Sequence, residues 1–125
     1  MIEFETDLSR SLFVIRYRGH VAPDQVEKSF DEIRRRLNDF QQDFRLLGDM
    51  TELETMDVGC APFIEQMMDL FNAKGVSTIV RIIPDPHRDI GLAIMSIFHY
   101  RGDVRVVTCQ SLAEADQILA AENAD

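Results

Sequence analysis

The residues of this chain that could do chemistry gather just before a predicted helix. Asp57, Cys60 and Pro62 lie within six residues of each other, and Asp49 precedes them. A proline fits only in the first turn of a helix, so the amides around Gly59 are predicted to point outward, where they could hold an anion. A cysteine at such a place can form a reactive thiolate, although a buried small hydrophobe is the commoner role. Asp49, Asp57, Gly59 and Cys60 are therefore the candidate regulatory or ligand site.

The rest of the sequence gives little support for catalysis or metal binding. His20, His87 and His99 fall on separate predicted elements, and none has another ligand at metal spacing on its own element. Cys60 and Cys109 do not form a C-x-x-C pair, so neither a zinc site nor a disulfide framework is predicted. The sequence contains no phosphate-binding glycine loop, dinucleotide fingerprint or G-x-S-x-G motif. We expect a protein that is not an enzyme and uses no metal or cofactor.

The composition is that of one globular domain covering residues 1–125. Hydrophobic residues make up 46% of the chain and charged residues 28%, with a formal charge of -9 at pH 7. This charge argues against binding to nucleic acid, which requires clustered positive charge. The longest uncharged stretch, residues 90–100, has 11 residues, whereas a bilayer-spanning helix needs about 20. Because the first residues are acidic and not basic, we expect a cytoplasmic protein without a signal peptide.

The elements that must position the candidate site begin with a predicted β-hairpin from Ile2 to Arg18, which ends at Gly19. Pro23 then suits the first turn of a helix of about four turns. The apolar stripe of this helix consists of Val26, Phe30, Ile33, Leu37 and Phe40. The segment FRLLGD is predicted to be the third strand, and the candidate site follows it in a strand-to-helix loop.

The second half of the chain continues the alternation of strands and helices. A helix over Pro62–Lys74 is predicted to end at Gly75, the β-branched run VSTIVRII to form a buried strand, and residues 85–102 to form a third helix. VRVVT is the last strand, and a capping box at Ser111 opens a final helix through Leu119. The order β-β-α-β-α-β-α-β-α predicts an α/β fold with a mixed, mostly parallel sheet and right-handed crossovers.

This element order, together with four residues of the candidate segment, resembles the anti-sigma factor antagonist family, whose fold is called STAS or SpoIIAA-like. The corresponding family segment is approximately D-L-S-G-V-S-F-I-D-S-S-G. Asp49 and Asp57 match its two aspartates, and Leu53 and Met56 match two of its apolar positions. The resemblance covers nearly the whole chain in topology but only this segment in residues. It implies a regulatory module that acts through protein contacts.

The chain departs from the family pattern at the residues of the family's switch. Val58, Gly59 and Cys60 stand at the S-S-G positions, so glycine replaces the serine that a kinase phosphorylates. Thr51 and Thr55 are nearby hydroxyls, but neither is expected to replace that serine. The chain therefore looks more like a stand-alone SpoIIAA-like subgroup without it. Since this fold group also resembles Sec14-type lipid-binding modules, a carrier of a small apolar ligand is the alternative function.

A protein-contact surface is predicted on the second and third helices. Residues 90–100 carry no charge and are apolar all round the predicted helix, so both sides of it should be covered. One side is expected to pack on the sheet. Packing between helices of one subunit explains the other side most simply, and homodimerisation is the next explanation, before an apolar small molecule. The predicted contact residues are Met67, Met68, Leu92, Met95 and His99.

Overall fold

The computed structural model describes residues 1–83 and 104–123, which form one sheet flanked by helices. The strands are β1 (Ile2–Asp7), β2 (Leu12–Val21), β3 (Arg45–Met56), β4 (Thr78–Ile82) and β5 (Arg105–Cys109). The helices are α1 (Pro23–Leu37), α2 (Ala61–Lys74) and α4 (Leu112–Asn123), with short 3-10 helices η1 (Leu8–Arg10) and η2 (Val58–Cys60). The predicted third helix, residues 85–102, lies outside the described residues.

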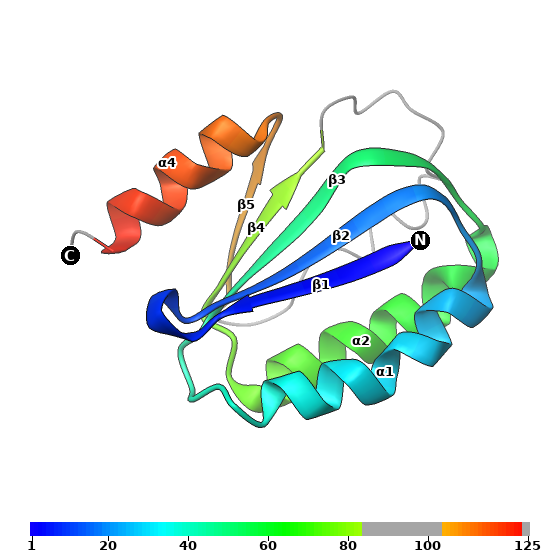
Figure 1. The fold of residues 1–125 in the computed structure, drawn as a ribbon, viewed down its shortest axis with the longest axis horizontal. Helices are drawn as coiled ribbons and strands as arrows, with labels where there is room; N and C mark the ends of the chain where they lie inside the picture. Colours follow the sequence, from blue (N-terminus) through cyan, green and yellow to red (C-terminus); the bar gives the residue numbers. More distant parts are fainter. Residues whose placement is uncertain (84–103, 124–125) are drawn as a thin grey trace.

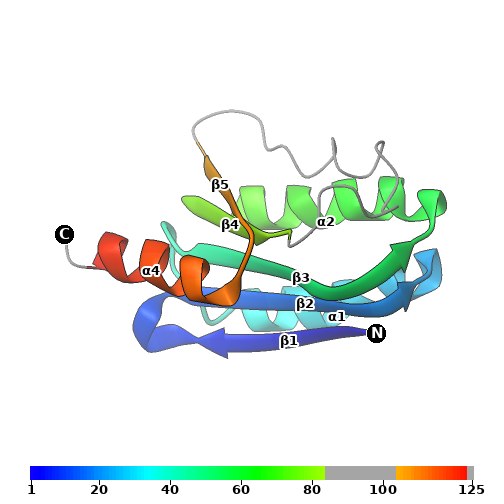
Figure 2. The same ribbon diagram turned by 90° about the horizontal axis from the view of Figure 1, so that it is seen from above.

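The five strands lie side by side in the order β1-β2-β3-β4-β5 (Figure 1). β1 and β2 are antiparallel, whereas β2, β3, β4 and β5 follow one another in parallel. α1 and α2 lie on one face of the sheet, and α4 lies across one end of the opposite face (Figures 1 and 2). The predicted α/β fold with a mixed, mostly parallel sheet is confirmed.

The N-terminal hairpin turns at η1, where Asp7 accepts hydrogen bonds from the Ser9 hydroxyl at 2.6 Å and the Arg10 N–H at 3.3 Å. The predicted hairpin is therefore confirmed. The prediction that it ends at Gly19 is wrong, because β2 continues to Val21. Gly19 lies inside the strand with a φ of 62°, a left-handed conformation that glycine adopts without the steric cost of a side chain. The glycine marks an irregularity in the pairing and not the end of the strand.

α1 begins at Pro23, as predicted, and buries its apolar stripe against the sheet. The helix ends at Leu37, however, so the prediction that Phe40 belongs to it is wrong. Asn38 and Asp39, which favour helices poorly, follow its last residue. Phe40 is nevertheless only 4% exposed, and its N–H donates to the Leu37 carbonyl at 3.0 Å. The apolar pattern thus identified a core residue but not the helix end.

β3 differs most from its prediction, because it runs to Met56 and does not stop near Asp49. Its pairing with Arg16–His20 of β2 shifts register twice, so β3 holds an extra residue at each place. Such bulges disturb the alternation of side chains between the two faces of a strand. Leu53 and Met56 are consequently both buried although they are three positions apart. What the sequence suggested to be a loop is mostly strand.

α2 has Pro62 in its first turn and ends at Gly75, as predicted. Gly75 has a φ of 99°, and its N–H donates to the Asn72 carbonyl at 3.1 Å, which closes the helix end. At the start of α4, the Ser111 hydroxyl accepts a hydrogen bond from the Glu114 N–H at 3.2 Å, the predicted cap. α4 extends to Asn123, four residues beyond its predicted end.

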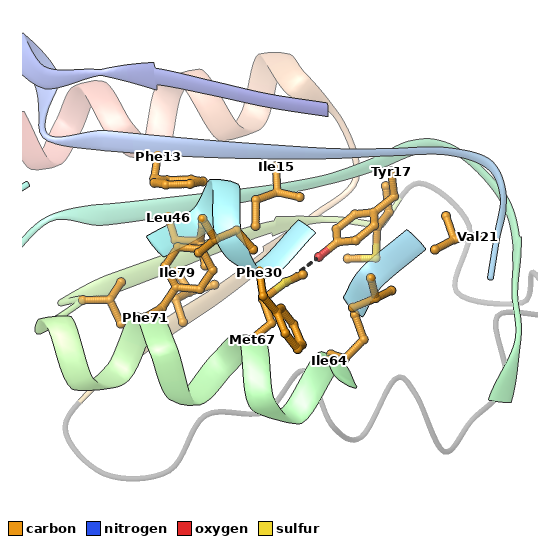
Figure 3. Packing of buried hydrophobic residues seen from close by; sticks show 14 of the residues in the cluster. Phe13, Ile15, Tyr17, Val21, Phe30, Leu46, Ile64, Met67, Phe71 and Ile79 are labelled. Atoms are coloured by element: carbon orange, nitrogen blue, oxygen red, sulfur yellow. Dashed lines mark hydrogen bonds between the residues drawn. The ribbon is translucent and has the colours of Figure 1, made fainter. Parts of the chain in front are cut away.

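The main core lies between the sheet and the pair α1 and α2 (Figure 3). In it the rings of Phe13 and Phe71 meet edge to face with centroids 5.1 Å apart. The Tyr17 hydroxyl donates to the Met67 sulfur at 3.6 Å, and burial raises the pKa of Tyr17. A second, smaller cluster joins the sheet to α4 and consists of Leu12, Val14, Leu47, Val80, Ile82, Cys109, Ala115 and Leu119.

Candidate functional site

The corner, which we define as residues 57–61, joins β3 to α2 and is held against the end of β2. The Asp57 N–H donates to the Val21 carbonyl at 3.1 Å, and the Cys60 N–H donates to the Asp57 carbonyl at 2.9 Å. The Cys60 thiol also donates to the Val21 carbonyl, at 3.5 Å. These bonds fix the backbone of the corner relative to the sheet.

His20 links the corner to β2 through its side chain. Its Nδ1 lies 2.5 Å from the Thr55 hydroxyl, and its Nε2 lies 3.4 Å from Oδ1 of Asp57. The side chains of His20 and Asp57 are about half exposed, so water screens their attraction. Sequence reasoning missed this cluster, because the contact depends on which residues of β2 and β3 stand opposite each other. The pair His20 and Thr55 follows only from the shifted register.

Cys60 is completely buried, so the structure favours its role as a small hydrophobe. Burial raises the pKa of its thiol, and the negative charge of Asp57 raises it further. Both effects disfavour the thiolate, which is the reactive form of cysteine. The second cysteine, Cys109, is also buried and free, and burial likewise raises the pKa of its thiol.

We therefore expect Cys60 to be protected from thiol reagents in the folded protein. Its reaction with Ellman's reagent at pH 8 should be at least about 100-fold slower than in urea-unfolded protein, because the chain must open locally first. A Cys109→Ala variant leaves Cys60 as the only thiol and makes the measurement specific. Rapid, stoichiometric labelling of native Cys60 would contradict its burial and revive a nucleophilic role.

The amides of the corner are less available to an anion than the sequence suggested. The Cys60 N–H donates to Asp57, as described above, and the Ala61 N–H donates to the Val58 carbonyl. Pro62 has no N–H to offer. The two N–H groups that precede Pro62 are therefore already bonded to carbonyl groups of their own turn.

Beside the half-exposed Asp57 carboxylate, the exposed surface of the corner is apolar and carries no hydroxyl. Val58 is 65% exposed, a high value for a valine in a folded protein, and Gly59 beside it is exposed. A side chain at Gly59 would place its Cβ 3.1 Å from Cγ of Pro23 at the start of α1. This contact is tight but not prohibitive, so glycine here keeps the corner close to α1.

Asp49 does not belong to the corner, contrary to its prediction as part of one site with Asp57. Seven residues of β3 lie between the two, and a rise of about 3.3 Å per residue over these eight steps places them up to roughly 25 Å apart. Asp49 lies instead within the sheet, where its Oδ1 accepts hydrogen bonds from the N–H and the hydroxyl of Thr51 at 2.9 and 2.5 Å. The structure thus brings Asp57, Gly59 and Cys60 together and leaves Asp49 elsewhere.

The residues predicted to form a contact surface are only partly described. Met67 is 2% exposed and contacts Tyr17, so its prediction as a surface residue is wrong: it faces the sheet (Figure 3). Met68 is half-buried at the edge of the same cluster. Leu92, Met95 and His99 lie outside the described residues.

A small cavity lies between the sheet and α2, close to the space predicted for an apolar ligand. Its volume is about 30 Å³, and Tyr17, Met67, Met68 and Phe71 are among the described residues that line it. This is room for about one water molecule, so an acyl chain would enter only if the lining moved apart. The carrier hypothesis stays a prediction.

Two further properties concern only residues 1–83 and 104–123. Within these ranges, His, Cys, Asp and Glu side chains do not gather in groups of three that could hold a metal ion. No helix in the described part of the chain has the length and hydropathy needed to cross a bilayer.

Comparison with known proteins gave no matching family model and no matching curated protein. Among solved structures, the chain is similar to the anti-sigma factor antagonist SpoIIAA in its unphosphorylated form. That match has a TM-score of 0.65 and 15% identity, and it covers 97% of this chain and 98% of the other. The chain has the SpoIIAA-like fold. The resemblance predicted from element order is thereby confirmed at the level of the fold.

A second protein with the SpoIIAA-like fold is similar to the same extent. It is an uncharacterised protein of the DUF3478 family from Shewanella loihica PV-4. Its TM-score is 0.65 at 14% identity, and the match covers 95% of this chain and 92% of the other. At such identities the shared property is the SpoIIAA-like backbone arrangement, and a function must be argued from the residues of this chain.

Proposed function

We propose that this chain is a non-catalytic protein-interaction module of SpoIIAA-like type that is not switched by serine phosphorylation. The fold is that of an anti-sigma factor antagonist among its structural neighbours. Val58, Gly59 and Cys60 offer no hydroxyl at the corner, and the buried Cys60 has a thiol unsuited to nucleophilic chemistry. Together these features support contact with a partner and not turnover of a substrate.

The exposure of Val58 on a fixed backbone is the observation that carries this proposal. A partner gains affinity from apolar surface that is already held in place, because little conformational entropy is lost on binding. The hydrogen bonds of Asp57 and Cys60 hold the residues on both sides of Val58. Val58 therefore presents a small, preorganised apolar contact next to the half-exposed Asp57 carboxylate.

The first partner to test is a second copy of the chain, since homodimers are the commonest oligomers of soluble proteins. The half-buried Met68 on α2 would contribute to such an interface together with the corner. Light scattering at micromolar concentration decides this part of the proposal. A mass that stays at the 14.3 kDa of one chain would rule out the homodimer but not a contact with another protein.

A photo-cross-linking residue at Val58, introduced in cells of the native organism, tests the module more broadly. We expect a discrete adduct, and Val58→Asp should weaken binding of the captured partner by about 10-fold or more, because it places a charge in an apolar contact. Leu8→Asp is the matched control: Leu8 is also apolar and 53% exposed, but it lies in η1. Equal effects of the two variants would contradict the proposal. A phosphopeptide from cells carrying phosphate on Thr51 or Thr55 would contradict the expectation that neither threonine replaces the missing serine.

A further inference from the structure

The sheet face that carries α4 is apolar at one end of its strands and charged farther along them. Near α4 it is apolar, with Leu12, Val14 and Leu47 buried beneath the helix. α4 covers only one end of this face (Figures 1 and 2). Farther along β1, β2 and β3 the face carries the charged side chains of Glu3, Glu5, Arg16, Arg18, Asp49 and Glu52.

These charges form two rows across the three strands. In the first row, Arg16 lies 2.7 Å from Glu5 on β1 and 3.7 Å from Asp49 on β3. In the second row, Arg18 lies 3.4 Å from Glu3 on β1 and 3.1 Å from Glu52 on β3. Each guanidinium group thus faces two carboxylates, and the rows together carry an excess of negative charge.

Asp49 leaves one of its two oxygens without a hydrogen bond. Its Oδ1 accepts two bonds from Thr51, whereas its Oδ2 has Arg16 Nε at 3.7 Å, which is beyond hydrogen-bonding distance. No other donor among the described residues bonds to Oδ2. Asp49 is only 9% exposed, so its carboxylate is shielded from water on most sides and open only toward the groove that it lines. An N–H group of a bound molecule would supply the missing donor.

A groove of about 350 Å³ adjoins the charged rows and reaches the start of α4. This volume is in the range of about 300–1,000 Å³ that is typical of ligand sites. Leu112 at its rim is 45% exposed and adds an apolar contact beside the carboxylates. The described lining includes Arg16, Arg18, Asp49, Thr51, Glu52 and Leu112.

We infer that this groove binds a segment of a partner protein that carries an arginine or lysine next to an aliphatic residue. The cationic group donates to Oδ2 of Asp49 and pairs with Glu52, while the aliphatic side chain packs on Leu112. An anion fits less well, because both arginines already face two carboxylates each. The formal charge of -9 draws a cationic segment toward the chain. The inference rests on the proposed function as an interaction module and adds a second contact surface with a stated chemistry.

Fluorescence anisotropy with a labelled peptide of alternating leucine and arginine tests the inference. Glu52→Gln should weaken binding about 3-fold or more and Asp49→Asn about 10-fold or more, because each removes a charge-assisted bond. Glu27→Gln and Asp31→Asn are matched controls that remove the same charges from exposed positions on α1, and they should change the affinity less than about 2-fold. Glu52 is 61% exposed, so its variant is informative even if Asp49→Asn folds poorly.

Equal weakening by the α1 controls would overturn the inference, because binding would then follow net charge alone. No binding at about 1 mM peptide would overturn it as well. Amide NMR shifts upon peptide addition should centre on Arg16, Thr51 and Leu112, and shifts confined to residues 57–61 would contradict the groove. The Val58 cross-linking experiment tests the proposed function separately. If a partner binds through Val58 but the peptide does not bind the groove, the proposed function stands and the groove inference is wrong. If the peptide binds the groove but no partner binds through Val58, only the role of the corner is contradicted.

Discussion

Replacing Phe71 by alanine is expected to lower the free energy of unfolding by about 3–5 kcal/mol. Phe71 is 1% exposed and joins α2 to the sheet through Phe13, with a second ring contact to Phe44 at 6.3 Å. Removing its ring deletes both contacts and leaves a void. The void cannot close easily, because Phe13 lies in a central strand that is paired on both sides.

Urea unfolding followed by circular dichroism measures this loss. Phe71→Leu keeps part of the buried apolar area and should cost less, about 1–2 kcal/mol, so it remains measurable if the alanine variant does not fold. Asn72→Ala on the exposed side of α2 is the control and should change stability by less than about 0.5 kcal/mol. If Phe71→Ala lost under 1 kcal/mol, the packing of α2 on the sheet would be contradicted.

The fold could be predicted from the sequence because its helices and central strands bury regular apolar patterns. Val26, Phe30 and Ile33 recur at helical spacing and are all buried in α1. The run VSTIVRII is apolar on both faces, and every residue of β4 is buried. Such patterns follow from the local geometry of one element, so neighbours in the sequence are sufficient to detect them.

β3 could not be delimited because its second half lacks the period of two that marks a strand. Leu53 and Met56 are three positions apart, and the polar pairs before and after Leu53 suggested a loop. The bulges that produce this spacing arise from pairing with β2, where Gly19 has a positive φ. This information lies about 35 residues upstream in the chain and is invisible to a local pattern.

The error in β3 explains the error in the candidate site. A loop starting after Asp49 would have brought Asp49 and Asp57 to one corner, whereas a strand separates them. Each aspartate then has its own surroundings: His20 for Asp57, and Thr51 with Arg16 for Asp49. The spacing of Asp49 and Asp57 that resembles the family segment therefore marked two separate surfaces at different places along β3, and not a single site.

Replacing Arg45 by methionine should lower the free energy of unfolding by about 2–3 kcal/mol, a consequence that no sequence pattern indicated. Arg45 begins β3 and is only 6% exposed. Its guanidinium donates to the Leu119 carbonyl of α4 at 2.9 Å and to the Arg10 carbonyl of η1 at 2.6 Å. Methionine matches the length of the side chain but cannot donate, so two carbonyl groups lose a charged partner.

Hydrogen exchange distinguishes this specific role of Arg45 from a general loss of stability. Arg45→Met should increase exchange in α4 more than in α1, because the bond to Leu119 ties α4 to the sheet. Arg45→Lys should recover only part of the loss, since an ammonium group does not reproduce the fork of a guanidinium. Arg35→Met, at an exposed position of α1, is the control. Equal increases in α1 and α4 would mean that Arg45 stabilises the sheet as a whole and does not anchor α4.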